Sequence, residues 1–208
     1  RVFRLEKDKA IINRNGFNNL GMAQAIKKLK NYRKKFPVGS DFILGVNIGP
    51  NKDSNDRFND YEILSKNLSE FADYLTINIS SPNTPNLRDF HQTNNLKKVL
   101  ISVKNGIAKS KSLDLQLPIF LKIAPDISKN DLKQIIETAN ENNISGLIIS
   151  NTTVDRNKEL QSDNLHETGG LSGIPLFNKS TNFLALASKI IKIKKYNLYL
   201  IAVGGVSD

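Results

Sequence analysis

The stretch YLTINISSPNTPNLR at residues 74–88 decides the fold class, because an apolar run passes directly into a polar loop that contains two prolines. The run Tyr74–Ile79 is too short and too uniformly apolar for an amphipathic helix, and it is typical of a buried parallel strand. Four further runs have the same character: Phe42–Ile48, Ile119–Ile123, Gly146–Ile149 and Leu198–Val203. The sequence therefore predicts five buried strands.

Helical patterns lie between these strands. Ser128 stands where an N-cap belongs, Asp131 follows three residues later, and an apolar stripe begins at Leu132. Comparable stripes are formed by Tyr61, Leu64, Leu68 and Phe71, by Leu96, Val99, Leu100 and Val103, and by Phe183, Ala187, Ile190 and Ile191. Strands that alternate with helices predict an α/β fold with a parallel sheet. Periodicity alone leaves open whether that sheet is doubly wound or closed into a barrel.

Length and composition indicate one domain. With 208 residues and 39% hydrophobic content the chain can bury a sizeable core, and no composition shift divides it. The chain opens at Arg1 rather than Met and stops just after Gly204 and Gly205. We therefore expect a single domain over residues 1–208 that is truncated at both termini. A closed eight-stranded barrel would need strands beyond the five predicted here.

Composition disfavours several functional classes. The chain contains no cysteine, which removes disulfides, thiolate nucleophiles and cysteine metal sites, and we predict no metal. No apolar run approaches the roughly 20 residues that cross a bilayer. The net charge of +10 could favour binding of nucleic acid, an anionic membrane or an anionic substrate. The lysines are scattered, however, and no aromatic residues are interleaved with them as in a face that binds single-stranded nucleic acid. We favour a solvated surface and predict no nucleic-acid partner.

Polar residues gather where the predicted strands end. They are Asn47, Asn78 with Ser80 and Ser81, Lys122, Ser150–Thr153, and Gly204–Gly205. Because α/β folds place ligand sites at the carboxyl ends of their strands, these side chains predict convergent hydrogen bonding to a planar polar ligand. Single asparagines also make turns and caps. Lys122 interrupts an apolar run, and it either reaches solvent from an edge strand or, as we favour, points inward to an anionic ligand.

Two glycine clusters follow late strands, at Thr168–Gly173 and Val203–Ser207. Their backbone N–H groups could cradle a phosphate, or the glycines could simply make tight turns. Neither cluster has Rossmann or P-loop spacing.

No His–Asp pair is placed to activate the serines at residues 80–81, so hydrolase chemistry is disfavoured. His91 and His166 are expected to be loop residues rather than catalysts.

Seven motifs, in order from Arg1 to Asp208, carry a family resemblance. They are INRNGFNNLG (Ile12–Gly21), LGVNIGPNK (Leu44–Lys52), INISSPNTPNLR (Ile77–Arg88), LKIAPD (Leu121–Asp126), ISNTTVDR (Ile149–Arg156), ETGGLSGIPL (Glu167–Leu176) and AVGGVS (Ala202–Ser207). Together they resemble the class 2, quinone-dependent dihydroorotate dehydrogenases, which are FMN-dependent (β/α)8 TIM barrels. The resemblance implies a single catalytic barrel domain over residues 1–208, incomplete here, with about five of the core strands present.

The resemblance also implies residue roles. Ser81 would be the base that takes the C5 proton of dihydroorotate while a hydride leaves C6 for the flavin. Thr84 would relay that proton to water, and Pro82–Arg88 would close over the substrate. The orotate-binding residues would be Asn13, Arg14, Asn15, Gly16, Phe17, Asn78, Asn83, Asn151 and Thr152. The FMN-binding residues would be Asn47, Asn78, Lys122, Ser150, Ser172, Gly173, Gly204 and Gly205. Asn86 stands where the family commonly has glycine, and asparagine tolerates the left-handed backbone expected there.

The implied partners are dihydroorotate or orotate, a quinone, and a membrane surface contacted peripherally through a missing N-terminal segment. The implied location is the cytoplasmic side of a bacterial inner membrane, with the mitochondrial inner membrane as the alternative. Three other interpretations stay open. A flavin-dependent tRNA dihydrouridine synthase would need a catalytic cysteine, which this chain lacks. The others are a phosphate-binding barrel isomerase and a nucleic-acid-binding module.

Overall fold

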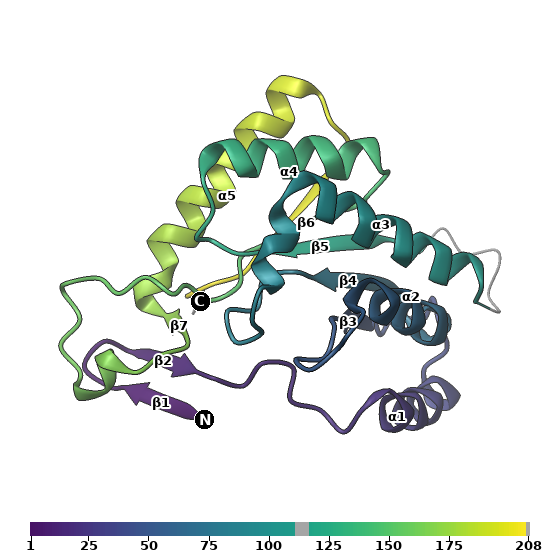
Figure 1. Cartoon of the computed structure of the whole chain (residues 1–208), viewed down its shortest axis with the longest axis horizontal. Coiled ribbons are helices and arrows are strands. Elements are labelled where there is room, and N and C mark those ends of the chain that lie inside the picture. Colours follow the sequence, from purple (N-terminus) through teal and green to yellow (C-terminus); the bar gives the residue numbers. More distant parts are fainter. Residues whose placement is uncertain (111–116, 207–208) are drawn as a thin grey trace.

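The larger sheet contains the five predicted strands. The computed structural model describes residues 1–110 and 117–206, so Ser207 of the second glycine cluster and Asp208 lie outside the described residues. The strands are β3 (Gly45–Ile48), β4 (Tyr74–Asn78), β5 (Ile119–Ile123), β6 (Gly146–Ile149) and β8 (Tyr199–Ala202) (Figure 1). Each lies within one predicted run, which confirms the five strands. The run that begins at Phe42 is longer than its strand, because Phe42 and Ile43 are exposed.

The order of these strands, β3-β4-β5-β6-β8, follows the chain. A doubly wound sheet reverses its order at a switch point, whereas a (β/α)8 barrel adds each strand beside the last. The strands are connected by α2 (Arg57–Leu68), α3 (Thr93–Ala108), α4 (Lys129–Glu141) and α5 (Ile174–Lys194), and α1 (Met22–Lys35) precedes β3. The fold is therefore an incomplete (β/α) barrel, as predicted.

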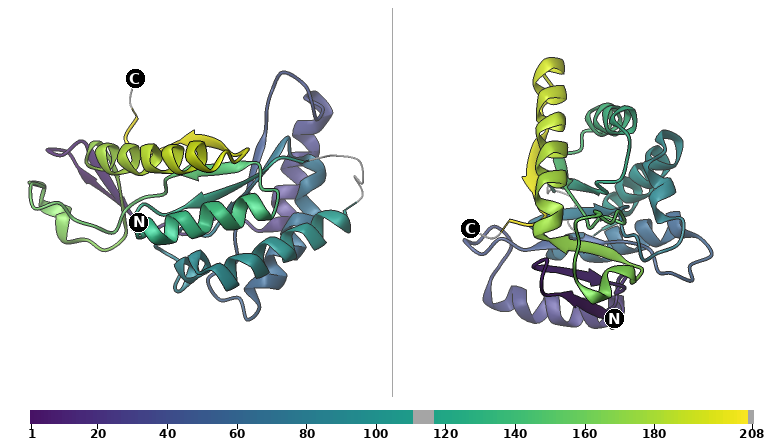
Figure 2. Two further views of the ribbon diagram at one scale, coloured as in Figure 1. Left: turned by 90° about the horizontal axis from the view of Figure 1, so that it is seen from above. Right: turned by 90° about the vertical axis from the view of Figure 1, so that its left-hand side faces the viewer.

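The helices pack on one face of this sheet, and the main hydrophobic core lies between the helices and the sheet (Figure 2). Leu75 and Ile77 of β4 and Leu96 of α3 are fully buried in one continuous apolar cluster. Alternate residues point to the opposite face. The paired positions on that face include Asn47↔Thr76, Thr76↔Phe120 and Asn78↔Lys122. This polar face is the one that a closed barrel would surround, and we call it the inner face.

The predicted start of α4 is confirmed in detail. Asp131 N–H donates to Ser128 Oγ at 3.1 Å, and Ser128 N–H donates to the Asp131 carboxylate at 3.3 Å, which completes a capping box. The stripe that begins at Tyr61 extends beyond α2, because Phe71 belongs to the separate 3-10 turn η1 (Ser69–Phe71).

Both histidines lie in connections between regular elements, but within short 3-10 turns that were not predicted. His91 ends the 3-10 turn η2 (Leu87–His91), and His166 ends the 3-10 turn η3 (Asp163–His166). His91 is buried, with 6% of its surface exposed. Turns this short carry too little periodicity to be recognised in a sequence.

A second, smaller sheet was not predicted. Its antiparallel strands are β1 (Val2–Leu5), β2 (Ala10–Asn13) and β7 (Gly170–Gly173), in the order β1-β2-β7. A small core of Leu5, Ala10, Ile12 and Leu171 holds it together. The strand β7 was interpreted only as part of a glycine cluster, because GLSG has no apolar run. By pairing β2 with β7, this sheet carries Asn13 to Gly170, beside the ends of the barrel strands.

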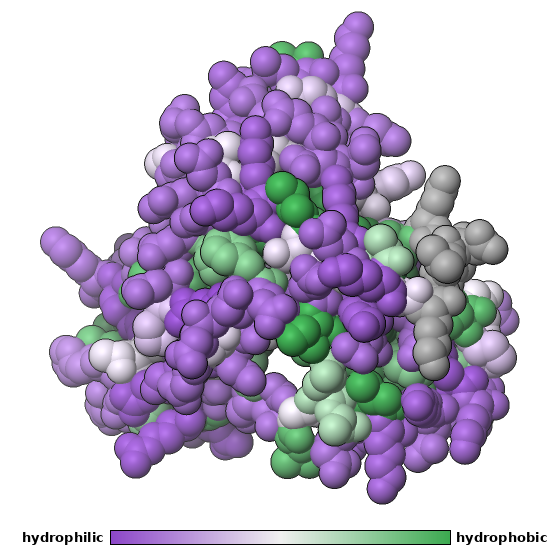
Figure 3. Space-filling model, turned by 45° about the vertical axis from the view of Figure 1, so that its right-hand side comes forward, coloured by the Kyte–Doolittle hydropathy of each residue, from purple (hydrophilic) through white to green (hydrophobic). Residues whose placement is uncertain are grey.

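The surface is mostly hydrophilic on the face shown in Figure 3, with small hydrophobic patches between polar side chains. None of the helices in the described part of the chain combines the length and hydropathy that a membrane span requires.

Candidate functional site

Amide side chains from separate strands meet at the carboxyl end of the sheet. Asn78, the last residue of β4, accepts hydrogen bonds at Oδ1 from Ser80 N–H at 3.1 Å and from Ser80 Oγ at 2.8 Å. Asn151, which follows β6, donates from Nδ2 to Ser80 Oγ at 2.8 Å and to Asn78 Oδ1 at 3.5 Å. Asn78 and Ser80 are buried, so this network is shielded from water.

Two more asparagines form a second hydrogen-bonded group. Asn83 donates from Nδ2 to the backbone oxygen of Asn13 at 3.1 Å and to Asn13 Oδ1 at 3.2 Å. Asn13 in turn donates to Gly170 O at 3.3 Å. A Cβ on Gly170 would stand 1.9 Å from Thr152 Oγ1, so glycine is needed for Thr152 to approach β7. We call Asn13, Asn78, Ser80, Asn83 and Asn151 the amide cluster.

Ser81 lies beside the amide cluster and is 6% exposed. Its Oγ accepts a hydrogen bond from Asn83 N–H at 3.3 Å. The hydrogen bonds found among the described residues do not join Ser81 to Thr84, which is itself buried. The proton relay through Thr84 therefore stays a prediction, as does the role of Ser81 as base.

Lys122 occupies the inner face directly opposite Asn78. Burial lowers the pKa of the Lys122 ammonium below its ordinary value. The hydrogen bonds and ion pairs of the described residues give this half-buried cation no partner. A buried charge without a partner is costly, so the position favours an anionic or electron-rich ligand. Asn47 lies on the same face but is exposed on the edge strand β3.

The two glycine clusters come together at the start of α5. A Cβ on Gly205 would lie 2.6 Å from Gly173 O, and a Cβ on Gly173 would lie 2.4 Å from Lys9 O. Gly173, Gly204 and Gly205 all have positive φ angles, which side-chain-bearing residues rarely adopt. Backbone N–H groups near a helix start favour a phosphate. At α5 the N–H of Ile174 already donates to Lys9 O at 3.3 Å and Pro175 has none, so the glycine backbone and later residues of the first turn would have to supply them. Ser172 Oγ donates to Ile11 O at 3.3 Å within the small sheet.

Ser150, the remaining predicted cofactor residue, is buried at the end of β6. Its Oγ donates to Asn151 O at 2.9 Å, and its N–H donates to Val203 O at 2.7 Å. These contacts fix the backbone from which Asn151 projects.

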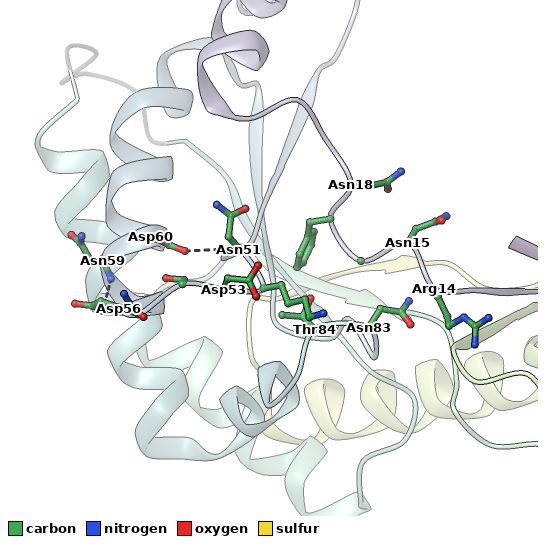
Figure 4. A pocket seen from close by; sticks show the side chains of 15 residues that line it. Arg14, Asn15, Asn18, Asn51, Asp53, Asp56, Asn59, Asp60, Asn83 and Thr84 are labelled. Atoms are coloured by element: carbon green, nitrogen blue, oxygen red, sulfur yellow. Dashed lines mark hydrogen bonds between the residues drawn. The ribbon is translucent and has the colours of Figure 1, made fainter. Parts of the chain in front are cut away.

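A hollow of about 800 Å³ opens beside the amide cluster (Figure 4). The predicted substrate residues that line it are Arg14, Asn15, Gly16, Phe17 and Asn83, and Thr84 joins them. Arg14 itself binds Glu167 at 2.9 Å and Thr168 at 3.1 Å. Lys122 and Ser81 do not line this hollow. The predicted residues thus divide between the hollow, the amide cluster and the inner face.

The opposite wall of the hollow was missed by sequence reasoning. It comes from the loop after β3 and the start of α2, and includes Asn51, Asp53, Asp56, Asn59 and Asp60. Asp60 accepts from Asn51 N–H at 3.2 Å, and Asp56 caps α2 by accepting from Asn59 N–H at 3.0 Å. Their position after the carboxyl end of a strand is the sequence feature that could have identified them as site residues.

In the described part of the chain, no three His, Asp or Glu side chains are grouped to hold a metal.

Comparisons with known proteins agree along the whole chain. A family model described as dihydroorotate dehydrogenase matches residues 1–208. The chain is 44% identical over 209 residues to a dihydroorotate dehydrogenase (quinone) of Brucella anthropi, and 47% identical over 208 residues to one of Mesorhizobium japonicum. It is 44% identical over 209 residues to a mitochondrial dihydroorotate dehydrogenase (quinone) of Cyclocybe aegerita. These matches cover 100% of this chain but only 55%, 55% and 61% of the relatives.

Solved structures give the same result. A crystal structure of DHODH from Eimeria tenella in complex with ferulenol superposes with a TM-score of 0.87 at 35% identity, covering 100% of this chain and 59% of that one. The ligand-free form from the same organism gives a TM-score of 0.88 at 37% identity, with coverages of 99% and 60%.

Proposed function

The chain belongs to the dihydroorotate dehydrogenase family, and from this premise we propose that the protein oxidises (S)-dihydroorotate to orotate in de novo pyrimidine (UMP) biosynthesis. FMN would be its cofactor and a quinone its electron acceptor. The observation that carries the proposal is the amide cluster, which lies next to Ser81 at the carboxyl end of barrel strands.

The amide cluster suits the pyrimidine ring of the substrate. The ring presents both N–H donors and carbonyl acceptors along its edge, and a carboxamide can donate and accept at the same time. Asn78 and Asn151 are held by each other and by Ser80, so their orientations are set before a ligand arrives. Such preorganised groups cost little reorganisation when charge develops on a ring oxygen.

Ser81 is the proposed base for the C5 proton. A serine hydroxyl is a poor base at neutral pH, so it needs a fixed oxygen and an exit for its own proton. The bond from Asn83 N–H fixes the oxygen, and Thr84, three residues after Ser81, lines the hollow. Deprotonation of C5 and loss of hydride from C6 together create the double bond of orotate.

The residues present fit FMN. When bound, FMN would supply the acceptor for the hydride. Lys122, with no carboxylate partner among the described residues, would lie against the polar edge of the ring, with Asn47, Asn78 and Ser150 nearby. The phosphate would bind at the glycine cradle of Gly173, Gly204 and Gly205, with Ser172 next to it.

We also propose peripheral attachment to a membrane, because the quinone is a lipid-soluble partner. The location would be the cytoplasmic side of a bacterial inner membrane, or the mitochondrial inner membrane. Relatives named dihydroorotate dehydrogenase (quinone) come from bacteria, and one is named as mitochondrial.

A spectroscopic experiment tests the proposal. The complete protein is purified, and its visible spectrum is recorded under anaerobic conditions before and after dihydroorotate is added without quinone. We expect a flavin absorption band that bleaches, and that recovers when quinone is supplied. A colourless protein, or a flavin that does not respond to dihydroorotate, would contradict the proposal.

A further inference from the structure

Arg88 joins the loops that follow three neighbouring strands. Its Nε donates to Ser80 O at 3.2 Å in the loop after β4, and its Nη2 donates to Thr152 O at 3.0 Å after β6. Its Nη1 binds Asp126 Oδ2 at 2.8 Å after β5. The three contacts leave the planar guanidinium in three directions, which a lysine ammonium on a flexible stem cannot reproduce.

Asp126 is a fixed anion at the centre of these contacts, with only 9% of its side chain exposed. Oδ2 also accepts from Val154 N–H at 3.0 Å, and Oδ1 accepts from Lys179 Nζ at 2.5 Å and from the Thr153 hydroxyl. Burial alone would raise the pKa of Asp126, but these hydrogen bonds, together with that from Arg88, hold it below its ordinary value. The carboxylate therefore stays charged and keeps Arg88 in place.

His91 braces the turn that carries Arg88. Ala124 N–H donates to His91 Nε2 at 3.3 Å, and His91 Nδ1 lies 2.8 Å from Arg88 O. Because Nε2 accepts, Nδ1 carries the proton and donates to that carbonyl. Burial lowers the pKa of His91 to about 4, so the ring is neutral at physiological pH and can keep both of these bonds.

These contacts set the geometry of the proposed site without reaching into it. The carbonyls that Arg88 binds belong to Ser80 and Thr152, the neighbours in sequence of Ser81 and Asn151. All the acceptors of its guanidinium in the described chain are backbone oxygens and the Asp126 carboxylate. We propose that Arg88, held by Asp126, is a positioning residue that fixes Ser81 relative to Asn151 and Thr152. This inference rests on the proposed function, in which Ser81 and Asn151 act on one substrate.

The expected effect is on rate rather than on folding. A displacement of about 1 Å in a reacting group can cost about 100-fold in rate. Arg88→Lys keeps the positive charge beside Asp126 but loses the bonds to one or both carbonyls. Asp126→Asn keeps the shape of the side chain but loses its charge. Arg33→Lys is the matched control, because Arg33 also binds an aspartate, at 2.7 Å, and backbone oxygens, but near the amino end of β4.

The test uses the complete flavoprotein and measures flavin content, thermal midpoint and the anaerobic rate of flavin reduction by dihydroorotate. For Arg88→Lys and Asp126→Asn we expect full flavin content and a reduction rate lower by about 10- to 100-fold per bound flavin. The kinetic isotope effect of C5-deuterated dihydroorotate should rise, because proton removal by a displaced Ser81 becomes limiting. Arg33→Lys should leave rate and isotope effects unchanged.

Three outcomes would overturn the inference. One is an unchanged reduction rate and C5 isotope effect in both variants at full flavin content. The second is an equal fall in rate for Arg33→Lys, and the third is loss of the folded flavoprotein in both variants, which would assign the pair to stability. A wild-type protein whose flavin ignores dihydroorotate would instead reject the proposed function, so the two failures are distinguishable.

Discussion

Two arginine–aspartate pairs lie at opposite ends of the same sheet. Arg88 and Asp126 are at the carboxyl ends of the strands, whereas Arg33 of α1 binds Asp73 at 2.7 Å directly before β4, at the amino end. Both arginines also bind backbone oxygens; Arg33 Nε donates to Phe71 O at 2.9 Å. The arginine of the amino-end pair is the more buried of the two, because 8% of the Arg33 side chain is exposed against 23% of the Arg88 side chain.

The difference lies in what each pair holds. Asp73 accepts hydrogen bonds from Gly39 N–H at 2.9 Å and Leu44 N–H at 2.7 Å, which fastens the connection between α1 and β3. Nothing on this connection carries the chemistry proposed above. The carboxyl-end pair holds the backbone next to Ser81 and Asn151. The same ionic chemistry therefore stabilises the fold at one end and sets a site at the other, as barrels commonly divide their two ends.

The largest expected effect separates two buried serines at these ends. Ser81→Ala should lower the rate of flavin reduction by about 10²- to 10⁴-fold, the usual contribution of a positioned acid or base, while FMN stays bound. Ser69→Ala is the control, because Ser69 is 2% exposed, lies before β4 and has no hydrogen-bond partner for its Oγ in the described chain. Stopped-flow absorbance measures both rates. Equal rates in the two variants would remove Ser81 from the base role.

Removal of the amino-end carboxylate should change stability and leave the chemistry intact. Asp73→Ala leaves the Arg33 guanidinium buried without its counter-ion, which typically costs about 3–5 kcal/mol. We expect the free energy of unfolding, measured by urea titration, to fall by about that amount. The reduction rate per bound flavin should stay at the wild-type value. A large fall in that rate would break the comparison between the two ends.

The smallest expected effect is a pH dependence confined to the carboxyl end. Burial lowers the pKa of His91 from 6.5 to about 4, so between these values the unfolded chain binds a proton that the folded chain does not. Stability from the neutral ring is therefore present above pH 6.5 and lost as pH falls toward 4. At pH 4.5 the loss should be about 2–3 kcal/mol.

Replacement of the two histidines checks this window. His91→Gln should flatten the dependence of the free energy of unfolding on pH over that range, whereas His166→Gln, at an exposed position, should retain it. The amino-end pair does not contribute there. Burial would raise the pKa of Asp73, but bonds from Arg33, Gly39 and Leu44 lower it, so its stabilisation is lost only at more acidic pH. The same slope in both histidine variants would remove His91 from this role.

Much of the barrel could be predicted from sequence because its strands are continuous apolar runs. Tyr74–Asn78 and Ile119–Ile123 match their predicted positions closely, and Ser128 caps its helix as its spacing predicts. The choice between a doubly wound sheet and a barrel could not be made from periodicity. Both topologies bury the same kind of strand, and only the order β3-β4-β5-β6-β8 separates them.

The candidate site was predictable only where it lies on strand ends. Asn78 ends β4 within its apolar run and Asn151 comes just after the run of β6, so both were predicted from strand ends. The turn at Asn86 has the left-handed φ of 57° expected where the family has glycine. The acidic wall of the hollow and the contacts of Arg88 were missed, because they depend on side chains that meet across loops. A local sequence pattern does not reveal contacts between side chains that are distant in the sequence.

The pairing of β2 with β7 has a consequence for the order of assembly. Asn13 and Gly170 are 157 residues apart, yet their bond completes the group that would bind orotate. Closure of so long a loop is slow compared with the formation of each βα unit. During synthesis, Asn13 is made early but can reach its place only after residues 170–173 have emerged from the ribosome. The barrel strands β3 to β6 can thus assemble first, and the group proposed to bind orotate is completed late.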